Sequence, residues 1–370
     1  MMYLTTLLAE SKLKLNIPSD IKKIYKLFKK NGKQLYVVGG AVRDAILGKS
    51  PKDFDLATDA KPDEVLKIAK QGGFKTVDVK GRQFGVVIVN GHEIATFRKD
   101  IGKGRRPDAV DFTDIKGDVQ RRDLTINALF YDIGQGQIVD LVGGIADLKK
   151  KKIRTVGKAE ERFDEDPLRK LRAVRFAGSV GGRMSKDTWN ALKQNSDISG
   201  VSAERIRDEF IKGVTKAKNV PNYFKMLQSL GMFKQIFPGL SVLMYRLKTN
   251  DYILQIAYML HTNDKDKVRS KLNSLKYTNQ EVNNIWLLIH MMKLNEVILD
   301  LPSFKKLQDN SSLSSSQVSQ WAKIHSDRNI LKLWNHKLSV TARDAIAQGL
   351  KGKDIGDYIK HKEAQLFISS

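Results

Sequence analysis

The chain carries Val37-Val38-Gly39-Gly40-Ala41-Val42-Arg43-Asp44 and, shortly after it, Asp53-Phe54-Asp55. A short apolar run, Leu35–Val38, ends at the two glycines, and a stretch of helical character, Ala41–Leu47, follows. This order predicts a strand, a glycine turn and the start of a helix. Phe54 and Leu56 then alternate with the two aspartates, and a period of two indicates a half-buried strand.

Two further runs, Val86–Val89 and Glu93–Phe97, are joined across Asn90-Gly91. An Asn-Gly pair between β-branched runs is the strongest short-range hairpin signal. Beyond Asp166 the pattern changes, because prolines become rare and apolar residues fall at helical spacing. We expect helices throughout that region, with a break at Asp309–Ser316, although serines also cap helices. The fold class is α+β, with a mixed sheet and helices first and an all-α remainder.

The composition narrows the class of partner. The 370 residues include 65 Lys and Arg against 41 Asp and Glu, a net charge of +24, and no cysteine. The charge favours a polyanion, nucleic acid before a membrane surface, over a merely solvated basic surface. Without cysteine there is no disulfide or zinc–thiolate site, and nothing points to zinc, haem or flavin. No apolar run is long enough for a membrane span and no signal peptide is evident, so we expect a cytoplasmic protein.

Asp53 and Asp55 stand two apart on a predicted strand, so both side chains leave the same face. Two carboxylates held close together repel unless a cation lies between them, and Mg²⁺ prefers such oxygen ligands with substrate phosphates. Glu93, on the second hairpin strand, is the candidate for a third acid. A lone Asp-x-Asp pair on a surface strand is the plainer interpretation.

Gly39 and Gly40, followed by Arg43, suit a phosphate, because backbone N–H groups at a helix start attract anions. The stretch is neither a Walker A loop nor a Gly-x-Gly-x-x-Gly turn, and a tight packing turn remains the alternative.

Residues 121–129 read as an amphipathic helix. Asp123 and Asn127, four apart, would share one face and hold a ribose hydroxyl, while Arg122 would hold a phosphate. A helix cap beside a surface polar patch explains them equally well.

Asp166 precedes Pro167, which suits the first turn of a helix, so Asp166 is placed as an N-cap. Asp166 and Arg169 also share a face and offer an acceptor beside donors. Cytosine and adenine both present an amine donor next to an accepting ring nitrogen, whereas uracil and guanine present the reverse. This pair would therefore accept C and A and reject U and G. Arg172 and Arg175 would follow Asp166 and Arg169 in one row along the helix and could reach the triphosphate.

Taken together, these stretches resemble class II tRNA nucleotidyltransferases, the CCA-adding group of the polymerase-β-like and poly(A) polymerase superfamily. The stretches that carry the resemblance are Val37–Asp44, Asp53–Asp55, Arg105-Arg106-Pro107-Asp108, Arg121–Leu129, Asp140–Gly144 and Glu165–Arg169, with a weaker match at Gly352–Lys360. The resemblance implies a nucleotidyltransferase head at 1–148, a base-reading neck at 149–215, a body at 216–308 and a tRNA-binding tail at 309–370.

The resemblance also implies an activity: C, C and A are added to the 3′ end of tRNA from CTP and ATP, without a template, and pyrophosphate is released. Asp53 and Asp55 would bind Mg²⁺, Asp123 and Asn127 would face the ribose, and Asp166 with Arg169 would read the base. The loop with Arg105, Arg106 and Asp108 is similar to the family's flexible loop, which helps to switch from C to A.

Bacterial poly(A) polymerases share most of these motifs and are the main alternative, although Gly81–Val87 looks more like the CCA-adding group. An enzyme that adds only A also stays open. Two further alternatives come from other classes: a non-catalytic RNA-binding protein and a nucleotidyltransferase for small molecules. The six histidines suggest no role, and none is followed by Asp, so no phosphohydrolase activity is expected. The oligomeric state is not predicted.

Overall fold

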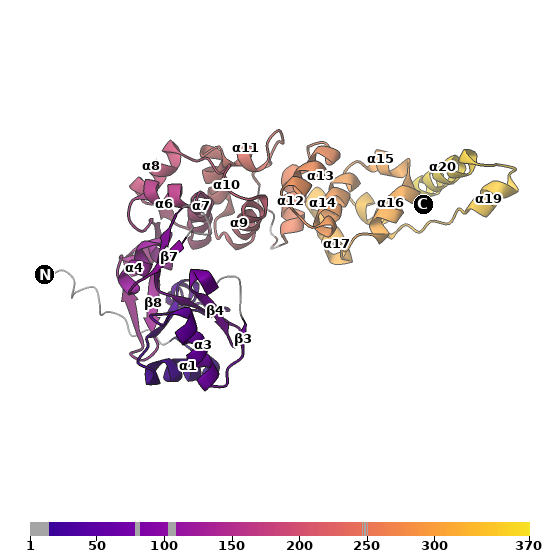
Figure 1. The fold of residues 1–370 in the computed structure, drawn as a ribbon. Helices are drawn as coiled ribbons and strands as arrows, with labels where there is room; N and C mark the ends of the chain where they lie inside the picture. Colours follow the sequence, from indigo (N-terminus) through magenta and orange to yellow (C-terminus); the bar gives the residue numbers. More distant parts are fainter. Residues whose placement is uncertain (1–14, 78–81, 103–108, 246, 248, 250) are drawn as a thin grey trace. The chain divides into compact units, whose positions relative to one another are not determined.

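The computed structural model describes residues 15–77, 82–102, 109–245, 247, 249 and 251–370. The chain forms two compact units, one of residues 1–200 with 217–219 and one of residues 201–216 with 220–370. The first unit combines a sheet with helices, and the second consists of helices (Figure 1). The predicted α+β class, with a mixed sheet first, is confirmed. The finer division at 148, 215 and 308 stays a prediction.

A mixed sheet of seven strands forms the centre of the first unit, as far as its residues are described, in the order β3-β4-β5-β2-β1-β8-β9. Among the described strands of this sheet, β2 and β5 pair in parallel and the other neighbours pair antiparallel. The strands are β1 (Leu35–Val38), β2 (Asp55–Thr58), β3 (Thr76–Val77), β4 (Val86–Val89), β5 (His92–Thr96), β8 (Leu129–Asp132) and β9 (Gln137–Asp140).

The predicted hairpin is confirmed, because β4 and β5 pair antiparallel with Val89 opposite His92. Asn90 and Gly91 both have positive φ, 50° and 85°. Positive φ at both central residues is the conformation of a type I′ turn, whose twist matches that of the two strands. The second strand begins one residue earlier than expected, at His92.

Helices and shorter ladders complete the first unit. The helices are α1 (Ser19–Lys30), α2 (Gly40–Ile46), α3 (Pro62–Gln71), α4 (Ile115–Gln120), α5 (Gly144–Lys149), α6 (Ala159–Glu165), α7 (Leu168–Val180) and α8 (Lys186–Gln194), with 3₁₀ turns η1 (Arg82–Phe84) and η2 (Thr125–Asn127). The ladders are β6 (Arg98–Ile101) with β7 (Ala109–Phe112), and β10 (Lys152–Ile153) with β11 (Arg183–Met184). The prediction that everything beyond Asp166 is helical is therefore wrong at β11.

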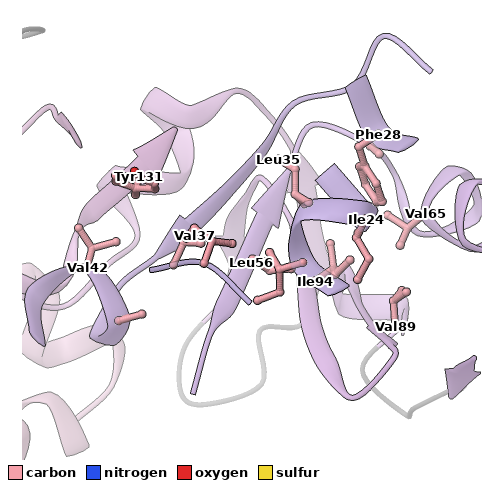
Figure 2. Packing of buried hydrophobic residues seen from close by; sticks show 14 of the residues in the cluster. Ile24, Phe28, Leu35, Val37, Val42, Leu56, Val65, Val89, Ile94 and Tyr131 are labelled. Atoms are coloured by element: carbon pink, nitrogen blue, oxygen red, sulfur yellow. The ribbon is translucent and has the colours of Figure 1, made fainter. Parts of the chain in front are cut away.

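Apolar side chains cover both faces of the sheet. Ile21, Ile24 and Phe28 recur at helical spacing on α1 and pack on one face with Val37 and Leu56 (Figure 2). The opposite face has its own cluster, formed by Val38, Ala57, Phe97, Val119, Ala128, Phe130 and Val156. Since side chains alternate along a strand, residues in register with Val38 belong to this second face. Asp55 is one of them.

Helices make up the second unit in the described part of the chain. They are α9 (Ala203–Lys216), α10 (Val220–Ser229), α11 (Met232–Ile236), α12 (Tyr252–Leu260), α13 (Lys265–Ser274), α14 (Asn279–Met291), α15 (Leu294–Ile298), α16 (Leu301–Asp309), α17 (Ser315–His325), α18 (Asn329–Asn335), α19 (Ala342–Ala347) and α20 (Lys353–Ser369). The predicted break is confirmed, because α16 ends at Asp309 and α17 begins at Ser315. Ser314 caps α17, with its hydroxyl accepting from the Gln317 N–H at 3.2 Å. Within the described residues, no helix has both the length and the apolar character needed to cross a membrane.

Candidate active site

The turn between β1 and α2 forms one side of the candidate site. Gly39 lies at φ 67°, which other residues adopt only with strain, and its N–H donates to the carbonyl of Leu129 at 3.0 Å. A Cβ at Gly39 would lie 3.6 Å from the guanidinium of Arg122, so this turn faces that side chain. The predicted strand, turn and helix are confirmed, and the turn lies beside Arg122.

Asp55 is the first residue of β2, and Asp53 precedes the strand by two residues. Both residues are exposed. Neither carboxylate has a hydrogen-bond or ion-pair partner among the described residues. Desolvation by the surrounding protein raises the pKa of the Asp55 carboxyl, Arg122 lowers it and Asp53 raises it again, with a net upward shift. Asp53 is the smallest of these three influences on Asp55, and the assignment of the two carboxylates to a cation stays a prediction.

Glu93 lies beside this pair by register. The parallel pairing of β2 and β5 sets Leu56 against Ile94, so Asp55 and Glu93, one residue earlier on each strand, stand on neighbouring strands. Glu93 is exposed. No group of three or more His, Asp or Glu side chains comes together closely enough to hold a metal in the part of the chain that the structure describes. The role of Glu93 stays a prediction.

The helix expected over residues 121–129 is wrong. Leu124 forms a bridge to Thr155, Thr125–Asn127 form the 3₁₀ turn η2, and β8 begins at Leu129. The long-range bridge holds this backbone extended, and helical periodicity in a short stretch cannot compete with it. Gly144 supports the turn: a Cβ there would lie only 2.2 Å from the carbonyl oxygen of Thr125.

Asp123 and Asn127 nevertheless meet, because η2 brings the Asn127 amide within 3.3 Å of the Asp123 carboxylate. Asn127 in turn accepts from the Arg43 guanidinium at 2.6 Å, and Asp123 accepts from Arg172 Nε at 2.7 Å. Burial alone would raise the pKa of Asp123, but Arg172 and hydrogen bonds from Leu124 N–H and Asn127 outweigh it and lower the pKa. Residues predicted separately from α2, η2 and α7 thus form one hydrogen-bonded chain.

Asp118, in α4, positions Arg122 and was not predicted. Its carboxylate is almost fully buried and accepts from Arg121 Nε at 2.8 Å and from Arg122 Nη2 at 2.9 Å. Arg122 also lies over the ring of Phe130, 4.6 Å from its centroid. The signal was present in the sequence, because an acid three and four residues before two arginines fits i, i+3 and i, i+4 pairing.

Phe176, in α7, is a second residue that sequence reasoning missed. Three guanidiniums lie around its ring, those of Arg175 at 3.9 Å, Arg43 at 5.0 Å and Arg172 at 5.5 Å from the centroid. Each contact is a favourable cation–π interaction that keeps a cation in place. The predicted row of Arg172 and Arg175 is thus anchored on an aromatic side chain, and nothing in the sequence pattern marked that side chain.

Asp166 and Arg169 lie at the start of α7. Pro167 occupies the N-cap position of α7, one residue later than predicted, while the Asp166 carboxylate still accepts from the Leu168 N–H at 3.1 Å. Arg169 donates to the Glu165 carboxylate at 2.5 Å and to the Arg121 carbonyl at 2.8 Å. Arg121, Glu165 and Arg169 line a cavity of about 220 Å³ together with Lys99, Asp100, Gly102, Gly117, Gln120 and Arg162. The flexible-loop residues Arg105, Arg106 and Asp108 lie outside the described residues.

A mixed sheet with an acidic pair at one strand end, a glycine turn and a row of arginines defines a nucleotidyltransferase head. The sequence model described as "Poly A polymerase head domain" matches residues 35–154, and the one described as "Probable RNA and SrmB- binding site of polymerase A" matches residues 183–244. The class of protein is therefore the poly(A) polymerase superfamily.

Sequence identity to curated relatives shows to which family within this superfamily the chain belongs. The CCA-adding enzyme of Ligilactobacillus salivarius is 32% identical over 364 residues, 92% of this chain and 87% of its own length. That of Bacillus licheniformis is also 32% identical, over 90% of both chains. The chain belongs to the CCA-adding enzymes, which are nucleotidyltransferases.

Solved structures agree with this assignment. A crystal structure of the Bacillus stearothermophilus CCA-adding enzyme in complex with CTP is 26% identical, with a TM-score of 0.68 over 95% of this chain and 93% of that one. The Thermotoga maritima CCA-adding enzyme complexed with tRNA is 20% identical with a TM-score of 0.65, over 97% of this chain and 94% of that one. This second likeness shows the fold.

Proposed function

We propose that this chain completes tRNA by adding C, C and A to its 3′ end from CTP and ATP, without a nucleic acid template. In each step the oxygen of the RNA 3′-hydroxyl forms a bond to the α-phosphorus of the nucleotide. The bond from that phosphorus to the bridging oxygen breaks, pyrophosphate leaves, and the hydroxyl proton goes to solvent. The cytoplasm is the proposed site of action.

One observation carries the catalytic part of the proposal. Asp53 and Asp55 lie exposed at the start of β2 and have no ion-pair partner among the described residues, although arginines pair with other aspartates nearby. Such a pair fits a divalent cation, and we assign Asp53 and Asp55 to Mg²⁺, with Glu93 as a further acid beside them. When bound, Mg²⁺ would make the 3′-hydroxyl more acidic and offset charge on the leaving pyrophosphate.

Cationic side chains of the chain itself would bind and orient the nucleotide. Arg122 lies close enough to Asp55 to lower its pKa, and Arg43 is joined to Asn127, so both are candidates for the triphosphate with Gly39 and Gly40. Arg172 and Arg175, stacked on Phe176, would extend this contact. Asp123 and Asn127 would hold the ribose.

Asp166 and Arg169 would read the base from the first turn of α7. An acceptor beside donors matches the amine and ring nitrogen that cytosine and adenine share. The site would reject uracil and guanine, because their reversed edge leaves buried polar groups unpaired. Since Arg169 donates to Glu165 in this structure, we expect a nucleotide to compete for those donors.

The test is to incubate the purified chain with Mg²⁺ and tRNA that lacks its last three nucleotides. CTP, ATP and both together are supplied in parallel, with UTP and GTP as controls. Ordered addition of C, C and A supports the proposal. A long A tail would indicate a poly(A) polymerase instead, and A added only to tRNA ending in CC would indicate an A-adding enzyme. RNA binding with no addition of any nucleotide would contradict it.

A further inference from the structure

A basic cavity lies in the first unit, among residues that none of the catalytic assignments uses. Its volume is about 440 Å³, and it is bordered by the end of α5, the β10–β11 ladder and the start of α8. Five of its nine lining residues are cations and none is acidic: the lining is Lys150, Lys151, Lys152, Gly181, Gly182, Arg183, Met184, Ser185 and Lys186. We refer to this feature as the basic cavity.

The backbone of the basic cavity brings like charges together and holds them there. β10 and β11 run parallel with Lys152 in register with Arg183, so these two cationic residues are direct neighbours. The Arg183 N–H donates to the Lys151 carbonyl at 3.0 Å. A Cβ at Gly182 would lie 1.8 Å from that carbonyl oxygen, so only glycine allows the two segments to approach this closely. The close approach of the two segments therefore depends on one residue type.

These charges are not compensated by the protein. Lys150, Lys151, Lys152, Arg183 and Lys186 are all exposed, and none forms an ion pair with any residue that the structure describes. Lys218 adds a sixth cation, because its side chain lies against Gly181, 3.7 Å from the position of a Cβ there. The arginines of the active site differ, since Arg121, Arg122 and Arg172 each pair with an aspartate. Unpaired like charges at one place favour a bound polyanion.

The position of the basic cavity relates it to the active site. Gly181 ends α7, and Arg169 lies near the start of the same helix. Gly181 comes twelve positions after Arg169, which corresponds to roughly 18 Å along the helix axis at 1.5 Å per residue. Arg172, between the two, bonds to Asp123. A single rigid helix thus joins the proposed base-reading end to the basic cavity.

We propose that the basic cavity binds backbone phosphates of the RNA substrate, away from the 3′ end that reacts. The inference rests on the proposed function for the identity of the RNA. Phosphate contacts of this kind set the position of a nucleic acid without reading its sequence, and duplex RNA is held mainly by shape and backbone. The cations come from four segments around the cavity, namely the end of α5, β10, β11 and the start of α8, and so are spread along its border. This spread suits a chain of phosphates better than a single free phosphate or pyrophosphate.

The test compares two double variants that each remove two lysine charges. Lys152→Gln with Lys186→Gln changes two walls of the basic cavity. Lys22→Gln with Lys29→Gln is the matched control, because both lysines are exposed on α1 and form no ion pair within the described residues. The dissociation constant of tRNA lacking its CCA end is measured from about 50 to 200 mM KCl. Each lost phosphate contact lowers the slope of log K against log[salt] by about 0.7 to 0.9.

We expect the magnitude of that slope to be smaller by about 1 to 2 in the cavity variant than in wild type. The cavity variant should also bind tRNA roughly tenfold more weakly at low salt. The control should keep the wild-type slope. Equal slopes for the two double variants would overturn the proposal. So would a cavity variant that loses binding of inorganic tripolyphosphate but keeps the tRNA slope. Because binding is measured without catalysis, a wild-type chain that adds no C, C and A would contradict only the proposed function.

Discussion

Two pairs of aspartates in the first unit have opposite surroundings. Asp118 is buried and Asp123 is half-buried, and they accept hydrogen bonds from Arg121, Arg122 and Arg172, whereas Asp53 and Asp55 are exposed and have no such partner among the described residues. The pKa shifts follow this difference. Burial would raise the pKa of Asp118, but Arg122 and Arg121 outweigh it and lower the pKa, while the pKa of Asp55 is raised.

Aspartate therefore has two different roles in the first unit. An aspartate with guanidinium partners stays ionised and fixes the position of those arginines. An aspartate beside a second carboxylate stays available for a cation that the protein does not supply.

Asp55→Asn should reduce nucleotide addition by about a thousandfold or more, because a metal ligand contributes several kcal/mol to such a reaction. The melting temperature should stay the same or rise, since the variant removes a charge that desolvation and Asp53 both disfavour. Single-turnover addition of CMP and thermal unfolding measure the two effects. Activity within tenfold of wild type would contradict the assignment of Asp55 to the metal.

Asp118→Asn should lower the free energy of unfolding by about 3 kcal/mol, because it leaves two largely buried guanidiniums without their carboxylate. Asp44→Asn is the matched control. Asp44 also pairs with an arginine, Arg43, but its side chain is 34% exposed, so the loss should stay below about 1 kcal/mol. Urea unfolding followed by circular dichroism compares them. Equal losses would show that burial of the pair does not matter.

Glu93→Gln should reduce addition by about tenfold, roughly 1.4 kcal/mol, and so by much less than Asp55→Asn. Glu93 stands next to Asp55 by strand register, but no three acids come together in the described residues. Glu64→Gln, on α3 and bonded to the backbone N–H of Lys61, is the control and should leave the rate unchanged. If Glu93→Gln reduced the rate of addition as much as Asp55→Asn, Glu93 would be as important for the reaction as Asp55.

Acid should weaken the first unit through Asp118 and Asp123. Their folded pKa values lie below the ordinary 3.8, so their contribution to stability is present above that pH and is lost as pH falls through the folded values. The contribution of Asp55 to stability changes with pH in the opposite direction. Its raised folded pKa favours the folded state at low pH, and this advantage is lost as pH rises. Unfolding free energies from pH 7 to about 3 should therefore fall less steeply in Asp118→Asn. If the unfolding free energy of Asp118→Asn fell with pH as steeply as that of wild type, Asp118 would not be a source of the acid sensitivity.

Local signals predicted much of the fold. The Asn90-Gly91 turn specified the hairpin, because positive φ at both residues needs those residue types. The helix break near Ser314 was equally local, since a capping box depends only on residues three apart. Residues 121–129 were misread because the bridge from Leu124 to Thr155 and the close packing of Gly144 are long-range contacts. Helical spacing over so short a stretch gives no sign of either.

Within the candidate site, the residue types and their local spacing could be predicted from the sequence: two carboxylates two apart, a glycine pair before a helix, and an Asp with an Arg at the start of α7. It did not determine which aspartates keep a guanidinium partner. Asp123 meets Arg172, which is 49 residues further along the chain, and Arg43 meets Asn127, which is 84 residues away. Those pairings could not be predicted from the sequence, because a contact between distant segments depends on how the sheet and α7 pack together. The same packing leaves Asp53 and Asp55 without a partner in the described chain.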